Sequence, residues 1–138
     1  MIILDTNVLS ELMRGEDEGD STVLAWVRGL ADQPVTTVLN RAEILAGVVL
    51  LPPGKRRDRL QMRATLTLDR IGVCLPLVPE CALTYADVVA TRRAAGRPIG
   101  AMDALIASVA ITSGADLATR DSAGFDGLGI TVIDPWRA

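Results

Sequence analysis

The chain has 138 residues, a length that predicts one domain over residues 1–138. Hydrophobic residues make up 49% and charged residues 22%, values typical of globular proteins and unlike those of disordered chains. The net charge is −3, and the absence of histidine excludes serine and cysteine triads, imidazole-dependent ribonucleases and zinc sites that need imidazole.

The first half of the chain predicts two strands and four helices. Residues 1–5 predict a short buried strand, and Asp5 can cap the helix that follows and ends near Gly15. Ser21 is expected to cap a second helix over residues 22–31, before a brief strand at residues 35–37. Two further helices are expected at residues 39–51 and 55–70, separated by the Pro-Pro-Gly sequence at residues 52–54.

The second half continues the alternation of strands and helices. Expected there are strands at 74–77, 117–119 and 130–133, and helices at 79–95 and 100–113. Strands that alternate with helices imply right-handed crossovers and parallel pairing. We therefore expect an α/β fold, a three-layer α/β/α domain with a mainly parallel five-stranded sheet.

The sequence also indicates a compartment. Its two cysteines, Cys74 and Cys81, cannot form a four-sulfur metal site and do not suggest a secreted disulfide framework. The first residues, MIILDTN, lack a basic segment, and the longest apolar stretch, residues 44–51, is far shorter than a membrane span. We expect a cytoplasmic protein that makes no contact with a membrane.

Three acids stand alone in apolar segments: Asp5 after MIIL, Glu43 inside LNRAEILAGVVLL and Asp103 inside IGAMDALIASVAI. Burying an unpaired carboxylate is costly, so each needs an explanation. A fourth acid, Asp121, follows the strand at residues 117–119. Asp5 and Asp121 come after strands, whereas Glu43 and Asp103 lie in the first turns of helices that start from the same edge. All four can therefore converge where sites of such sheets form.

Each of these acids also has a purely structural interpretation. Asp5 can serve only as a helix cap, and Asp103 can favour the first turn of its helix through the helix dipole. Glu43 can form a buried ion pair with an arginine, and Asp121 can be an ordinary turn residue.

A cluster of four carboxylates points to a hard metal ion. At separations of about 5 Å, each ionised pair would repel by roughly 3 kcal/mol at an effective dielectric constant of 20. A divalent cation removes this repulsion, and oxygen ligands without histidine or cysteine select Mg²⁺ or Mn²⁺. Such ions bind phosphodiesters and activate water, so the residues favour a nuclease or a phosphatase.

Five segments of the chain stand in a characteristic order and spacing: MIILDTNVLSEL, AEILAGV, LPPGKRRDRL, IGAMDALIASVA and LATRDSAGFDGLGITVIDPW. Together they resemble the PIN-domain ribonucleases, and among them the VapC toxins of type II toxin–antitoxin systems, with FitB-like members most similar. The resemblance covers essentially the whole chain.

The resemblance implies a PIN-like fold and a Mg²⁺-dependent endoribonuclease that cleaves RNA by metal-activated water. The acidic quartet of the family falls on the four acids selected above. Asp5 and Asp103 would be the main metal ligands, Glu43 would complete the shell or orient water, and Asp121 would hold a second or weaker ion. Asp126 is a rival of Asp121 for the fourth position.

Supporting residues and partners follow from the same resemblance. Thr6, Asn7 and Thr119 would support the site through hydrogen bonds, although Thr6 and Asn7 also suit a helix cap. The implied partners are a cognate antitoxin that occupies the groove, an RNA substrate and a second copy in a homodimer.

Basic residues gather in two places. Arg92 and Arg93, with Arg97, lie near Asp103 in sequence and are the expected substrate-binding residues. A basic segment can also contact phosphates, or can simply be a solvated helix face; it contains Lys55, Arg56, Arg57, Arg59, Arg63 and Arg70.

An alternative function stays open: a catalytically silent PIN-fold module that acts by binding a protein or nucleic-acid partner. Other acidic-site families fit less well. Haloacid-dehalogenase phosphatases want a second aspartate where Asn7 stands, and receiver domains need a late lysine, whereas the only lysine is Lys55.

Overall fold

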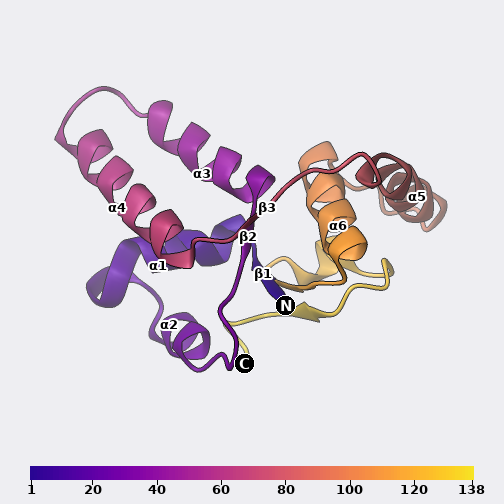
Figure 1. The fold of residues 1–138 in the computed structure, drawn as a ribbon, viewed down its shortest axis with the longest axis horizontal. Coiled ribbons are helices and arrows are strands. Elements are labelled where there is room, and N and C mark those ends of the chain that lie inside the picture. The colour runs from indigo at the N-terminus through magenta and orange to yellow at the C-terminus, as the bar shows by residue number, and fades with distance from the viewer.

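The computed structural model describes residues 1–138 and shows strands alternating with helices (Figure 1). The strands are β1 (Ile2–Leu4), β2 (Thr36–Thr37), β3 (Cys74–Leu75), β4 (Asp116–Ala118) and β5 (Val132–Ile133). The α-helices are α1 (Thr6–Glu18), α2 (Ser21–Arg28), α3 (Val38–Val49), α4 (Lys55–Ile71), α5 (Cys81–Ala94) and α6 (Ala101–Ser113). A short 3-10 helix, η1 (Ser122–Phe125), follows β4.

All strand pairs are parallel, as expected, but only three strands form the main sheet, in the order β1-β4-β5. Strands β2 and β3 form a separate pair, joined to β1 by one bridge between Ile3 and Val35. Pro34 precedes Val35, and Pro76 follows β3. Because proline has no N–H to donate to a ladder, the pairing on this side stays short.

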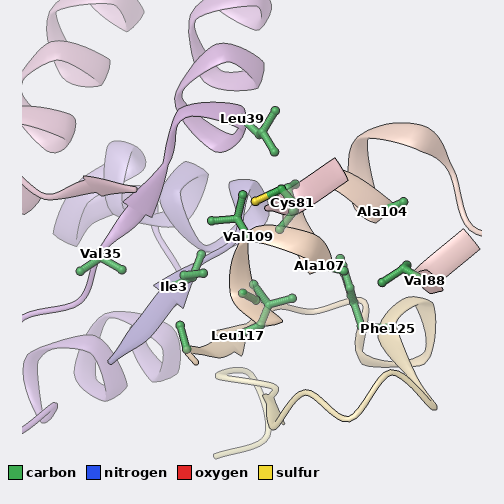
Figure 2. Packing of buried hydrophobic residues seen from close by; sticks show 13 residues of the cluster. Ile3, Val35, Leu39, Cys81, Val88, Ala104, Ala107, Val109, Leu117 and Phe125 are labelled. Carbon is green, nitrogen blue, oxygen red and sulfur yellow. The ribbon is translucent and has the colours of Figure 1, made fainter. Parts of the chain in front are cut away.

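Two apolar clusters cover the two faces of the sheet. Successive strand residues point to opposite faces, so Ile3 and Leu117 pack on one side while Leu4 and Ala118 pack on the other. Helices α5 and α6 cover the first side (Figure 2), and α1 to α4 lie on the opposite side in Figure 1. The expected three-layer α/β/α architecture is thereby confirmed.

Several element ends differ from those expected. Helix α1 continues to Glu18 across a kink at Gly15, where φ is 73°, a left-handed value that glycine adopts readily. Helix α2 is capped by Asp20 rather than Ser21, because the Asp20 carboxylate accepts bonds from two backbone N–H groups of the first turn. Helix α5 begins at Cys81, not Pro79.

No helix combines the length and apolar character that crossing a bilayer requires.

Arg92 has a structural role that differs from the expected one. Its side chain is buried, with 6% of the residue exposed. The guanidinium donates hydrogen bonds to the carbonyl oxygens of Arg97, Ala123 and Asp126 at 2.9, 3.2 and 3.0 Å. Arg92 therefore fastens the segment around η1 to α5 through its Nε and Nη1 atoms. Because the residue is buried and these donors are engaged by carbonyl groups, the expectation that Arg92 binds substrate is corrected.

Replacing Arg92 with alanine should lower the free energy of unfolding by about 3 kcal/mol, since three carbonyl groups would lose charge-assisted partners and the buried stem of Arg92 would lose its packing. Urea unfolding measures this effect. The neighbouring Arg93 is exposed, so Arg93→Ala is the matched control and should change stability by no more than about 0.5 kcal/mol. Equal stabilities of the two variants would contradict the structural role of Arg92.

Candidate metal and nuclease site

Two of the four candidate acids lie at one edge of the main sheet. Strands β1 and β4 are parallel neighbours, with Leu4 opposite Ala118, so their carboxyl ends meet. Asp5 directly follows β1, and Asp121 comes shortly after β4 as the residue that caps η1. The other two acids come from helices: Glu43 lies in the second turn of α3 and Asp103 in the first turn of α6.

Asp5 is fixed by three hydrogen bonds from three different elements. One carboxylate oxygen, Oδ1, accepts from the backbone N of Thr6 at 2.9 Å and from Nδ2 of Asn40 at 3.0 Å. The other oxygen, Oδ2, accepts from Oγ1 of Thr119 at 2.7 Å. The Thr6 bond is the expected helix cap, but the other two donors come from α3 and from the end of β4. A cap alone does not explain this arrangement.

The three residues expected to support the site all take part in this network. Thr6 donates from Oγ1 to Oε1 of Glu43 at 2.8 Å. Asn7 donates from Nδ2 to Oγ1 of Thr119 at 3.1 Å, and its Oδ1 accepts from the backbone N of Arg120. Neutral hydroxyl and amide groups therefore orient the carboxylates without neutralising their charge.

Asn40 belongs to the same network, although it is not among the residues expected from the sequence. It is completely buried, and its Nδ2 donates to both Asp5 and Oγ1 of Thr6. Its Oδ1 accepts from Oγ1 of Thr37 at 2.6 Å. The signal was present in the sequence, because Asn40 precedes Glu43 by three residues and so shares its helix face.

The electrostatics of Asp103 show how the four acids are related. Its pKa is raised above the ordinary value of 3.8, first by burial and then by the negative charges of Asp5, Glu43 and Asp121. None of these four acids belongs to any of the five ion pairs of the structure. The buried ion pair considered for Glu43 is therefore absent, and the negative charge of the group is uncompensated.

Asp126, the rival for the fourth position, lies in a different environment. Its carboxylate pairs with Arg97 at 3.1 Å, and it is not among the charges that raise the pKa of Asp103. Asp121 accepts a bond from the backbone N of Gly124, where any side chain would collide with the Asp121 carboxylate. The geometry favours Asp121 over Asp126 as the fourth acid.

The donor set fits a hard divalent cation in charge and chemistry. It contains only oxygen atoms, from carboxylates that have no cationic partner, which is the ligand type of Mg²⁺ and Mn²⁺. No three acidic side chains already form a closed set of ligands around one point. The residues that could hold an ion are Asp5, Glu43, Asp103 and Asp121, which are related through the charges that act on Asp103.

Asp103→Asn should stabilise the protein at neutral pH in EDTA. Because the folded-state pKa is raised, the folded protein binds the proton more tightly, and the free energy of unfolding falls as pH rises above 3.8 through the folded pKa. The asparagine variant lacks this loss, so the two stabilities should converge below pH 3.8 and separate at pH 7. Urea unfolding across this range measures the difference, with Asp126→Asn as a control. Parallel curves would contradict it.

Comparison with known proteins identifies the family. The PIN domain model matches residues 2–129. The chain is 38% identical to plasmid stability protein StbB of Pseudomonas syringae pv. tomato over the full length of both chains. It is also 36% identical to VapC ribonuclease Y4jK of Sinorhizobium fredii and 33% identical to toxin FitB of Neisseria gonorrhoeae, covering 99% of each chain in both cases.

Solved structures agree with these relatives. The crystal structure of FitAcB from Neisseria gonorrhoeae superposes with a TM-score of 0.88 at 31% identity and covers all of both chains. The structure of FitAB bound to a DNA fragment gives the same TM-score at 32% identity, over 99% of this chain and 96% of that chain. The chain therefore belongs to the PIN-domain family, alongside VapC and FitB relatives.

Proposed function

We propose that this protein is a metal-dependent endoribonuclease and the toxin of a type II toxin–antitoxin system. The observation that carries the proposal is the acidic group itself: burial and then the charges of three carboxylates raise the pKa of Asp103, and no cation of the chain pairs with any of the four acids. Its relatives support the assignment, because one is named a VapC ribonuclease and another a toxin.

In this proposal Asp5 and Asp103 are the main ligands of Mg²⁺, with Mn²⁺ as a substitute. Glu43 completes the shell or orients water, and Asp121 holds a second or weaker ion. When bound, the ion supplies positive charge for the phosphate oxygens and lowers the pKa of water. Arg93 lies exposed at the end of α5 and is proposed to contact a substrate phosphate.

The chain's own residues set the conditions for this chemistry. Thr119 and Asn40 hold the two oxygens of Asp5 in a fixed orientation. Asp103, whose pKa is raised, must release its proton before it can serve as a ligand, so acid weakens metal binding. The supporting hydrogen bonds come from neutral groups, which leaves the negative charge available to a cation.

Asp5→Asn and Asp103→Asn should each lower RNA cleavage by at least about 100-fold, since even partners outside the coordination shell cost 10–100-fold. Asp126→Asn, which changes an acid paired with Arg97, is the matched control and should stay active. Excess EDTA should abolish cleavage, and the products should carry 3′-hydroxyl ends. Folded protein that cleaves RNA in EDTA would contradict the metal mechanism, and no cleavage by pure wild type would favour a silent binding module.

The proposed partners are a cognate antitoxin and a second copy of the chain. The antitoxin is suggested by the FitAB complex, and the homodimer by the resemblance to the family. Leu77, just before α5, is 46% exposed, and Leu83, on α5, is 72% exposed. Together they form apolar surface that a second copy could cover. The proposed place of action is the cytoplasm, where Cys74 and Cys81, both free in the structure, stay reduced.

Expression of the wild-type chain without a partner should arrest growth, because uncontrolled RNA cleavage stops protein synthesis. Asp103→Asn, expressed to the same soluble level, should permit growth. Counting colonies after induction measures the difference, and co-expression of the cognate antitoxin should restore growth of cells that make the wild type. Normal growth with abundant soluble wild-type protein would contradict the toxin role.

A further inference from the structure

The turn that follows β5 lies at the same edge of the main sheet as Asp5 and Asp121. Strand β5 pairs in parallel with β4, and the backbone N of Thr119 donates to the carbonyl oxygen of Ile133 at 2.9 Å. The chain then turns, and the backbone N of Trp136 donates to the carboxylate of the residue two positions before it. The indole of Trp136 packs against the apolar cluster on the α1–α4 side of the sheet. This turn therefore places an aromatic side chain beside the end of β4.

Arg120 directly precedes one of the four acids in the chain. It stands between Thr119, which donates to Asp5, and Asp121. Its backbone N donates to Oδ1 of Asn7 at 3.2 Å, so its main chain is fixed to the network around Asp5. The residue is exposed, and its guanidinium stays charged because arginine does not deprotonate in proteins. A cation that could compensate an acid is thus attached to the site itself.

The guanidinium of Arg120 nevertheless binds none of the acids. Its Cζ atom lies 5.0 Å from the centre of the Trp136 ring, which is the geometry of a cation–π contact. Arg120 belongs to none of the five ion pairs, and its one donated side-site contact is from the backbone N to Asn7. All the causes that shift the pKa of Asp103 raise it, and no cation is among them. The aromatic face of Trp136 therefore holds this charge away from the acids.

We propose that Trp136 is a positioning residue, which keeps Arg120 off the carboxylates so that a divalent cation can bind them. The inference rests on the proposed metal-dependent endoribonuclease function. An arginine released from the indole would find unpaired carboxylates beside it, and arginine forms strong charge-assisted hydrogen bonds with such groups. It would then compete with the metal ion for the same oxygen atoms. Trp136 consequently acts on metal affinity through Arg120, without being a ligand.

Trp136→Leu removes the aromatic face but keeps apolar packing. The matched control is Trp26→Leu, because Trp26 packs against the same apolar cluster and has no arginine over its ring. Protein freed of metal with EDTA and then dialysed is titrated with Mn²⁺, and electron paramagnetic resonance measures the free ion. Trp136→Leu should raise Kd for Mn²⁺ by a factor of about 2 to 5, the preference that an exposed cation–π contact supplies. Trp26→Leu should leave Kd unchanged.

A second substitution separates positioning from packing. In the Arg120→Ala background, Trp136→Leu should have no effect on Kd for Mn²⁺, because the competing guanidinium is gone. Trp136→Phe retains a weaker aromatic face and should give a smaller increase than Trp136→Leu, and it carries the same comparison if the leucine variant does not fold. An equal increase in Kd with and without Arg120 would overturn the inference, and so would an unchanged Kd in Trp136→Leu.

RNA cleavage measured against Mg²⁺ concentration supplies a second readout. Trp136→Leu should raise the Mg²⁺ concentration that gives half of the maximal rate, while kcat at saturating Mg²⁺ and KM for RNA stay near their wild-type values. A lower kcat at saturating Mg²⁺ with an unchanged Mg²⁺ requirement would overturn the inference even though the protein cleaves RNA. Wild-type protein that binds Mn²⁺ no better than Asp103→Asn would instead refute the proposed function.

Discussion

Uncompensated negative charge at the ends of β1 and β4 is the constraint on which the site depends. Asp5 cannot relax toward an arginine, because hydrogen bonds from Thr6, Asn40 and Thr119 hold both its oxygens. Neutral donors stabilise an ionised carboxylate yet leave its charge in place. The pKa of Asp103 is therefore raised by its own burial and, in addition, by the charges of the neighbouring acids. Repulsion among these acids lowers the free energy of unfolding, and burial of the apolar clusters on both faces of the sheet helps to offset it.

The order of strands and helices could be predicted where the local pattern of apolar residues matches the burial that the structure shows. The apolar run at residues 2–4 and the regular spacing of the helices fix the order of elements and hence the parallel layers. The width of the regular sheet could not be predicted, because it depends on hydrogen bonds between distant segments that Pro34 and Pro76 interrupt. The cap of α2 was placed one residue too late, since Asp20 and Ser21 are both good capping residues.

The acids of the candidate site could be predicted from the sequence, but the residues that position them could not. A lone acid in an apolar helix indicates burial, but burial alone does not indicate chemistry. Glu11 is such an acid: it is 8% exposed, yet its Oε2 accepts from the backbone N of Asp20 and ties α1 to α2. Arg92 is close to Asp103 in sequence, but its side chain donates to the carbonyl oxygen of Asp126, a direction that closeness in sequence does not reveal. Asn40 was missed because a neutral amide reveals its role only through its partners.

The network around Asp5 also has a temporal consequence. Its donors come from residues 6, 40 and 119, so the carboxylate is fully held only when chain segments far apart in sequence have come together. Strand β4 lies between β1 and β5, and its last contacts require residues 132–133. A chain still being translated therefore lacks this arrangement until residue 119 and the strand that pairs with β4 have left the ribosome. Synthesis itself thus delays the assembly of the site, and the ribosome that makes the protein works beside a chain whose site is incomplete.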